Sequence, residues 1–181
     1  MKNTKSMHPT VFSALHTNCK EELDELYKSW AKRYDADVLN TIGYIGHIIS
    51  TELLLKYLSA TDARILDAGC GTGLVGEILE RKGFDDVVGV DFSQSMLDQA
   101  GEKSIYRSLE LADLTQDFAF DDNTFDAIIC AGTFTCGHVG PDALIEMVRV
   151  CKISGYISFT VREQEWDGAP YVEIKIGRAH V

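Results

Sequence analysis

Three glycines at alternate positions follow a short apolar run that ends in an acid, in the segment Ile65-Leu66-Asp67-Ala68-Gly69-Cys70-Gly71-Thr72-Gly73. Glycine adopts dihedrals that other residues avoid, and its missing side chain lets a ligand approach the main chain. The run Leu74–Leu79 that follows is helical in pattern, and a helix start offers unpaired N–H groups to a polar or anionic group. The pattern predicts a strand, a tight turn (Gly69-Cys70-Gly71) and a helix N-terminus that hold a ligand against bare backbone.

Acidic residues also follow the next two apolar runs, and their carboxylates suit a nucleoside. Asp91 ends the run Val88-Gly89-Val90, where a carboxylate can accept hydrogen bonds from both hydroxyls of a ribose. Phe92 and Met96 would supply apolar walls for a purine. Asp113 lies just beyond the third run and can accept from an adenine amino group. These residues predict an adenosine site beside the glycine turn.

Two cofactors fit this arrangement. The segment Gly71–Gly76 matches the dinucleotide pattern GxGxxG, and Asp91 follows at about the distance of a ribose-binding acid. Binding of S-adenosylmethionine would explain more of these residues than binding of a dinucleotide would. Asp67 ends a strand that a nicotinamide-binding protein would usually continue with apolar residues, and Asp113 would have no role in dinucleotide binding. An acid at Asp67 can order the glycine loop or meet an ammonium group. We therefore predict S-adenosylmethionine and keep a nicotinamide dinucleotide as the alternative.

The elements that position these residues alternate between strand and helix, which predicts an α/β fold with a mostly parallel sheet covered by helices on both faces. In such sheets ligands bind at the carboxyl ends of the strands, where the winding direction reverses. The fourth strand ends at Ala131 and runs into Gly132-Thr133-Phe134, whose backbone can face the methionine part of the cofactor; Ala131 and Gly132 are counted among the cofactor-binding residues. Strands are expected at Ile65–Ala68, Val87–Val90, Ser108–Ala112, Phe125–Ala131 and Tyr156–Val161, and helices at Leu74–Arg81, Gln94–Ala100 and Pro141–Lys152.

Composition bounds the class of protein. A length of 181 residues favours one domain, and 45% hydrophobic residues exclude a disordered chain. The net charge of −11 is opposite to that of a phosphate-backbone binder, so we expect no nucleic-acid substrate. No apolar run approaches the ~20 residues of a membrane helix, and no secretory h-region follows the N-terminus. The five cysteines form no CxxC pair, which favours reduced thiols and a reducing compartment. We expect a cytoplasmic monomer without a bound metal or a membrane partner.

These residues, in this order, resemble the class I S-adenosylmethionine-dependent methyltransferases from about Tyr27 to Glu163. A closer resemblance is to the methyltransferase-like proteins typified by the Williams–Beuren syndrome region methyltransferase. It is carried by the segment Tyr27–Asp37, by the glycine turn, by Gly89–Ser93 with Met96-Leu97, and by Thr124–Ala127.

The resemblance implies a Rossmann-like fold with an N-terminal helical lid, from which Tyr34 closes over the cofactor. It implies cofactor contacts from Gly69, Gly71, Asp91, Phe92, Asp113 and Leu114. Two lid helices are expected, one carrying Trp30 and Tyr34 at helical spacing and one over about Asp37–Tyr57. We divide the chain into a mobile leader (1–17), the lid (18–58), the cofactor-binding core (59–168) and a tail (169–181).

The tail is expected to be irregular or foreign to the protein. Its last residues, Ile-Gly-Arg-Ala-His-Val, can be encoded by ATC GGA AGA GCA CAC GTC, which resembles a common sequencing-adapter oligonucleotide. The family sheet has seven strands, and the resemblance implies an antiparallel hairpin after the fifth. Only about twenty residues follow Val161. We therefore expect a chain truncated at its C-terminus that lacks this hairpin. The complete protein is expected to be an enzyme, and the activity of this fragment is left open.

Methyl transfer from a sulfonium needs little from the protein beyond positioning of the acceptor and exclusion of water. A general base is needed only for acceptors that keep their proton at neutral pH. His138 follows the fourth strand and is the best single candidate to face an acceptor. We predict methyl transfer to an unidentified small molecule or protein side chain. The alternatives are a nicotinamide-dependent oxidoreductase and a cofactor-binding protein without catalytic activity.

Overall fold

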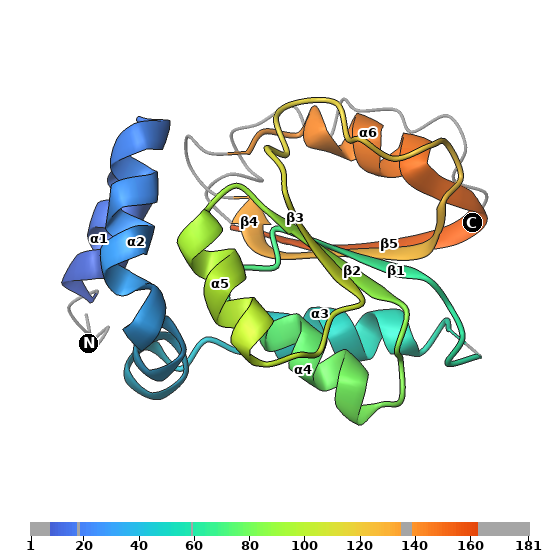
Figure 1. Ribbon diagram of the computed structural model, residues 1–181, viewed down its shortest axis with the longest axis horizontal. Helices are drawn as coiled ribbons and strands as arrows, with labels where there is room; N and C mark the ends of the chain where they lie inside the picture. The colour runs from blue at the N-terminus through green and yellow to red at the C-terminus, as the bar shows by residue number, and fades with distance from the viewer. Residues whose placement is uncertain (1–7, 18, 59, 135–138, 163–181) are drawn as a thin grey trace, which may run out of the picture.

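The computed structural model describes residues 8–17, 19–58, 60–134 and 139–162, and its centre is a five-stranded parallel sheet (Figure 1). The strand order β3-β2-β1-β4-β5 places the reversal of winding between β1 and β4. β1 and β2 are buried along their whole length, as expected for apolar runs covered on both faces. The strands are β1 Ile65–Ala68, β2 Val87–Asp91, β3 Ser108–Leu111, β4 Phe125–Phe134 and β5 Cys151–Val161.

Helices cover both faces of the sheet, as predicted. α3 (Gly46–Leu55), α4 (Leu74–Arg81) and α5 (Gln94–Glu102) lie on one face, and α6 (Ala143–Val150) lies on the other (Figure 1). Each face has its own core of buried apolar side chains. One is built around Ile128, Phe134 and Met147, and the other around Leu79 and Ile129.

The predicted boundaries of the last helix and strand were wrong. The helix expected to run through Lys152 ends at Val150, and β5 begins at Cys151, five residues before the expected start at Tyr156. The sequence Cys-Lys-Ile-Ser-Gly mixes helix-compatible and strand-compatible residues, so periodicity alone could not place the boundary. Pairing with β4 decides it, because Cys151 pairs with Phe125.

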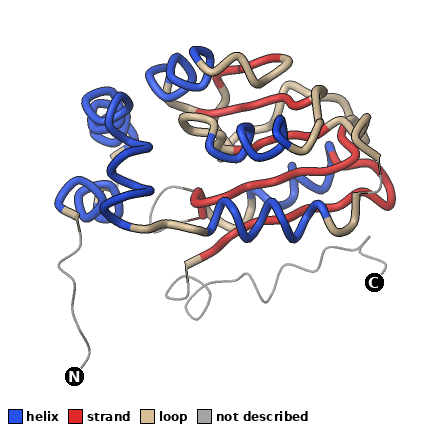
Figure 2. Tube along the Cα trace, turned by 90° about the horizontal axis from the view of Figure 1, so that it is seen from below, coloured by secondary structure: helices blue, strands red, loops and turns tan. Residues whose placement is uncertain are grey.

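A helical unit before the sheet packs beyond the carboxyl ends of the strands, next to α5 (Figures 1 and 2). The lid of the structure comprises three helices: α1 Pro9–His16, α2 Lys20–Ala36 and the π-helical segment η1 Asp37–Ile42. It differs from the expected range 18–58, because α1 packs with it and α3 packs on the sheet instead. The lid has a small core of its own, in which Leu23, Trp30 and Val38 are buried.

Two expectations for this region were wrong. The segment expected to be a mobile leader without helical periodicity contains α1, which packs its buried Ala14 into the lid core; eight residues are too few to show a clear period. The single helix expected over Asp37–Tyr57 is divided between η1 and α3, because Gly43 adopts φ +71° and ends the first segment. Residues 1–7 and 163–181 lie outside the described residues, so the expected tail and missing hairpin stay predictions.

Within the described ranges, no single helix is long and apolar enough to cross a membrane. One pair of helical segments, Lys20–Ile42 and Gly46–Leu55, meets the length and composition limits only when taken together, and it is bent by 91°.

Candidate cofactor site

The glycine turn between β1 and α4 brings bare backbone to the reversal point of the sheet. Gly69 and Gly71 have φ values of +77° and +54°, in the left-handed region that glycine tolerates. A Cβ at Gly69 would collide with the side chain of Thr133 from β4. A Cβ at Gly71 would meet no atom within 4 Å, so this residue faces open space. The turn is held to β2 because the N–H groups of Gly69 and Cys70 donate to the carbonyl of Val90 at 2.8 and 2.9 Å.

Asp91 ends β2 directly beside this turn. Its Oδ2 accepts the N–H of Gly71 and its Oδ1 accepts the N–H of Ser93, both at 2.9 Å. Burial raises the pKa of the Asp91 carboxyl, and the N–H groups around it, including that of Phe92, oppose this rise. A carboxylate has about four lone-pair positions, so Asp91 keeps acceptor capacity toward the cavity that it lines.

Asp67 lies beneath the turn and lines neither of the two cavities described below. Its side chain is buried; Tyr106 Oη donates to Oδ2 at 2.6 Å, while Oδ1 has no partner among the described residues. Burial raises the pKa of Asp67 to about 7; the Tyr106 hydrogen bond opposes the rise and the charge of Asp91 adds to it. The carboxyl therefore supports the turn from below rather than from the cavity wall.

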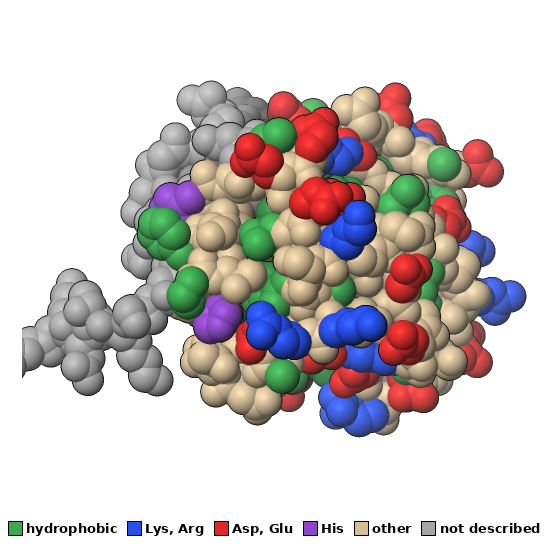
Figure 3. Space-filling model, turned by 60° about the vertical axis from the view of Figure 1, so that its left-hand side comes forward, with side chains coloured by type: hydrophobic (Ala, Val, Ile, Leu, Met, Phe, Trp, Pro, Cys, Tyr) green, Lys and Arg blue, Asp and Glu red, His purple; other side chains and the backbone are tan. Residues whose placement is uncertain are grey.

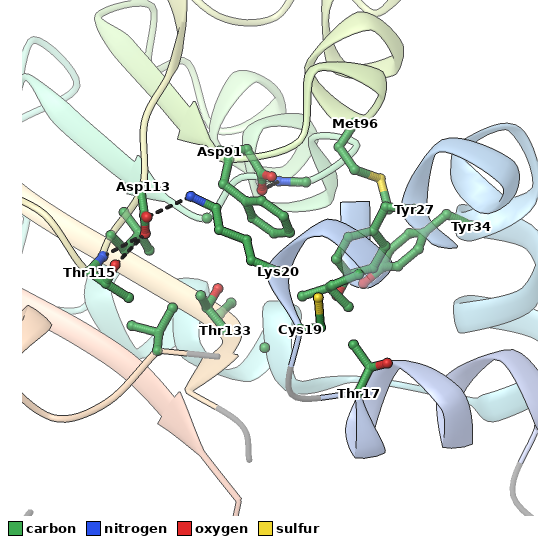
Figure 4. Close-up of a pocket in the computed structure, with 18 residues that line it drawn as sticks. Thr17, Cys19, Lys20, Tyr27, Tyr34, Asp91, Met96, Asp113, Thr115 and Thr133 are labelled. Atoms are coloured by element: carbon green, nitrogen blue, oxygen red, sulfur yellow. Dashed lines mark hydrogen bonds and ion pairs between the residues drawn. The ribbon is translucent and has the colours of Figure 1, made fainter. Parts of the chain in front are cut away.

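A cavity of about 270 Å³ opens in front of Asp91, between the lid and the sheet (Figure 4). The sequence predicted ten of its lining residues: Tyr34, Gly69, Gly71, Asp91, Phe92, Met96, Asp113, Leu114, Ala131 and Gly132. Sequence reasoning missed the lining residues from the N-terminal helical region and from the segments after β3 and β4: Thr17, Cys19, Lys20, Leu23, Tyr27, Thr115 and Val139. Thr133, in β4, was expected to contribute only its backbone. Tyr27 lies in the segment that carried the family resemblance, which was the available signal.

Lys20 crosses the mouth of this first cavity. Its Nζ donates to Asp113 Oδ2 at 2.6 Å and lies 5.8 Å from the centre of the Phe92 ring (Figure 4). Thr115 donates through both its N–H and its hydroxyl to the other oxygen of Asp113. Burial alone would raise the pKa of Asp113, but Lys20 and Thr115 hold it below its ordinary value. Asp113, which was predicted to accept a hydrogen bond from an adenine amino group, therefore also binds Lys20 of the lid.

A second cavity, of about 320 Å³, continues from the first on the other side of the glycine turn. The two cavities share the walls made by Tyr27, Tyr34, Gly69, Gly71, Ala131 and Gly132. Cys70, also predicted as a site residue, lines the second cavity alone. The remaining wall is mainly apolar or aromatic: Val11, Ala14, Trp30, Val38, Ile42, Tyr44, His47, Thr72, Leu74, Val75, Phe134, Thr160, Val161 and Arg162.

The far end of α2 is fastened to the core next to the turn. Asp35 accepts a hydrogen bond from the hydroxyl of Thr72 and forms an ion pair with Lys103 at 2.7 Å. Lys103 also pairs with Glu77 of α4 at 2.5 Å. With Lys20 at its other end, α2 is held at both ends, and this places Tyr34 over the turn. His138, the expected acceptor-facing residue, lies outside the described residues.

The dinucleotide alternative fits this geometry poorly. In that pattern the middle glycine, Gly73, would let the backbone approach a pyrophosphate. A Cβ at Gly73 would instead meet Tyr106 and Ile105, and one at Gly76 would overlap Tyr106. Gly73 and Gly76 therefore leave room for the side chains of Ile105 and Tyr106, which precede β3. The glycines of this turn that line the cavities are Gly69 and Gly71.

Comparison with known proteins agrees with the fold and the site. Residues 66–159, about half of the chain, match the family model described as a methyltransferase domain. Human methyltransferase-like protein 27 is 37% identical over 139 residues, which are 75% of this chain and 56% of that protein. A demethylmenaquinone methyltransferase of Staphylococcus aureus is 30% identical over 148 residues, covering 76% of this chain and 59% of that protein.

Among solved structures, a TehB-like SAM-dependent methyltransferase from Corynebacterium glutamicum matches with a TM-score of 0.62 and 25% identity, over 85% of this chain and 81% of that one. The chain belongs to the class I S-adenosylmethionine-dependent methyltransferase family. Membership implies binding of S-adenosylmethionine. The narrower Williams–Beuren type stays a prediction. The chain spans only 56% and 59% of the two relatives compared by sequence, so the activity of a whole protein is a proposal.

Proposed function

We propose that the chain binds S-adenosylmethionine across the two cavities and transfers its methyl group to a small-molecule acceptor. The adenosine part would occupy the first cavity, and the methionine part would lie at the glycine turn where the cavities meet. The observation that carries this proposal is electrostatic. The Asp91 carboxyl group lies at the turn on the wall of the first cavity, and the lysine that reaches this cavity is already paired with Asp113.

This charge distribution discriminates between the two candidate cofactors. A pyrophosphate carries negative charges and would face Asp91 without a compensating cation at the turn. S-adenosylmethionine carries a sulfonium and an ammonium group at the corresponding end, and both are attracted by carboxylates. Arg162, the other cation on the cavity walls described, lines the second cavity. The turn therefore favours a cationic ligand.

The walls of the first cavity also suit an adenosine. Asp91 retains lone pairs for ribose hydroxyls, and Phe92, Met96 and Leu114 offer apolar surface to a purine. A ligand can approach Gly71 closely because a Cβ there would point into open space. When bound, S-adenosylmethionine supplies a methyl group on a good leaving group. The protein's own residues then bind and orient the two substrates and exclude water, and the lid contributes the half-buried side chain of Tyr34 to the wall of the site.

A small-molecule acceptor is supported by the second cavity and by the surface charge. The cavity has the volume of a small-ligand site and mainly apolar walls. On the face shown in Figure 3, basic side chains lie among acidic ones, which gives a polyanion no continuous basic surface there. The name of the S. aureus relative shows that the family includes proteins acting on small molecules. Action on a small molecule remains the proposal for this chain.

Calorimetric titration with S-adenosylhomocysteine tests the cofactor part of the proposal. We expect saturable binding, and at least a tenfold loss of affinity in Asp91→Asn, because hydrogen bonds to a charged group contribute about 1.5–3 kcal/mol. Glu110→Gln is the matched control, since it removes an exposed carboxylate from the adjacent strand β3. Tighter binding of NADH than of S-adenosylhomocysteine by the folded protein would refute the proposal.

A further inference from the structure

Two buried polar atoms without partners lie on the wall of the second cavity. They are Tyr44 Oη and His47 Nδ1, and neither makes a hydrogen bond to a described residue. The Tyr44 hydroxyl lies near the side chain of Thr160, but without hydrogen-bond geometry. His47 is 6% exposed, and its ring stacks on that of Tyr44 with centroids 5.4 Å apart. The two rings thus present adjacent unsatisfied polar atoms at one place.

Two other polar side chains of this cavity already have hydrogen-bond partners. Thr160 Oγ1 accepts the N–H of Gly132 at 2.7 Å, and the Thr72 hydroxyl donates to Asp35. A buried polar atom without a partner costs about 1–3 kcal/mol. Two such atoms next to the shared wall of the cavities therefore indicate a place where a polar group of a ligand completes the hydrogen bonding.

Burial favours the neutral form of His47, in which one ring nitrogen carries a free lone pair. Burial lowers the pKa of His47; the carboxylates of Asp35 on α2 and Glu77 on α4 oppose this, and Arg81 on α4 adds to it. A neutral imidazole has one nitrogen free to accept a proton. The ring is fixed at the start of α3, where its backbone carbonyl accepts the hydroxyls of Ser50 and Thr51.

We propose that Tyr44 and His47 bind the hydroxyl group of a flat apolar acceptor, a phenol or an enol, and that His47 Nδ1 accepts the hydroxyl proton. The inference rests on the proposed function. The O–H bond breaks, the proton passes to Nδ1, and the electron pair stays on the oxygen and forms its bond to the methyl carbon. S-adenosylmethionine supplies that methyl group, and its sulfur keeps the electron pair of the broken C–S bond.

A hydroxyl acceptor fits this pair better than an aromatic amine does. A phenol keeps its proton at neutral pH and becomes a strong nucleophile only when a base removes it. An aromatic amine already has a free lone pair at neutral pH, so it needs no base before attack. A hydroxyl can also donate to the imidazole nitrogen while it accepts from the Tyr44 hydroxyl, which satisfies both orphan atoms. Trp30, Tyr34 and Phe134 supply walls suited to a flat ring.

Binding of 2-naphthol to the protein saturated with S-adenosylhomocysteine tests this inference without turnover. We expect 2-naphthol to bind at least tenfold more tightly than naphthalene, and its naphtholate absorbance to appear at a pH below that of free naphthol. Tyr44→Phe should weaken the binding at least fivefold. His47→Gln should abolish the naphtholate signal, since an amide takes no proton, whereas His16→Gln at an exposed histidine should change neither.

The outcomes separate this inference from the proposed function. If S-adenosylhomocysteine fails to bind to the folded chain, the proposed function is wrong and the inference falls with it. If it binds but naphthol and naphthalene have equal affinities, or the naphtholate signal survives in His47→Gln, only this inference is overturned. Tighter binding of 2-naphthylamine than of 2-naphthol would likewise overturn the hydroxyl assignment. Should His47→Gln not fold, Tyr44→Phe alone still tests it through the affinity ratio of naphthol to naphthalene.

Discussion

Replacement of Asp67 by Asn should change the pH dependence of stability. In the cofactor-free protein, burial raises the pKa of this carboxyl to about 7, against an ordinary value near 3.9. The native state therefore holds this proton more tightly than the unfolded chain does. The stability that goes with the neutral form is fully present below about pH 4 and is lost as the pH rises through about 7.

The magnitude follows from this difference in pKa. About three pKa units at 1.36 kcal/mol each give a loss of at most about 4 kcal/mol between pH 4 and pH 8. Asp67→Asn has no charge to bury, and its amide oxygen can still accept the hydroxyl of Tyr106. An unpartnered amide N–H near the position of Oδ1 adds a constant cost of about 1–3 kcal/mol, which does not depend on pH.

Urea unfolding followed by circular dichroism, at intervals from pH 4 to pH 8, measures the effect. The free energy of unfolding of Asp67→Asn minus that of the unmodified chain should rise by several kcal/mol across this range. Asp85→Asn, at an exposed position, is the control and should give a flat difference. A flat difference for Asp67→Asn as well would refute the reasoning, because it would show that the buried carboxylate is compensated in the native state.

Three further predictions concern the lid and the thiols. Lys20→Met should lower the free energy of unfolding in urea by less than about 1 kcal/mol, because the Lys20 side chain is 55% exposed. The same substitution should speed release of S-adenosylhomocysteine, measured by stopped flow. An unchanged release rate would contradict the role of Lys20 at the cavity mouth. Trp30→Phe removes the 2.8 Å hydrogen bond from the indole N–H to Asp37, and it should lower the free energy of unfolding by about 1–3 kcal/mol. A decrease below about 0.5 kcal/mol would show that water replaces this hydrogen bond. Cys19 is exposed and should react with a thiol reagent in the folded protein. Cys130 should react only on unfolding, because it is buried and burial raises the pKa of its thiol to about 12. Cys19→Ser should therefore remove the fast phase of the reaction, and a fast phase that persists at full amplitude in this variant would contradict the assignment.

The positions of the glycine turn and of Asp91 were predictable because their signals are local. Alternate glycines, an acid at the end of an apolar run and a helical period each act within a short stretch of chain. Together they predict that Gly71 and Asp91 lie at one edge of the sheet, and a hydrogen bond of 2.9 Å joins the two residues. Boundaries were less predictable where two elements compete for the same residues. β5 begins at Cys151 because pairing with β4 outweighs helix continuation, and Gly43 divides a run whose apolar pattern alone suggests one helix.

The sequence by itself determined the fold class and favoured one kind of cofactor, since apolar runs and glycines constrain the backbone wherever they occur. Only the tertiary structure decided which distant side chains complete the site. Lys20 meets Asp113 across 93 positions of sequence, Tyr106 supports Asp67 across 39, and His47 reaches the second cavity through the packing of α3 beside α4. Such contacts depend on the relative placement of whole elements, which is set by burial of their apolar faces and leaves no local signal in the residues that meet.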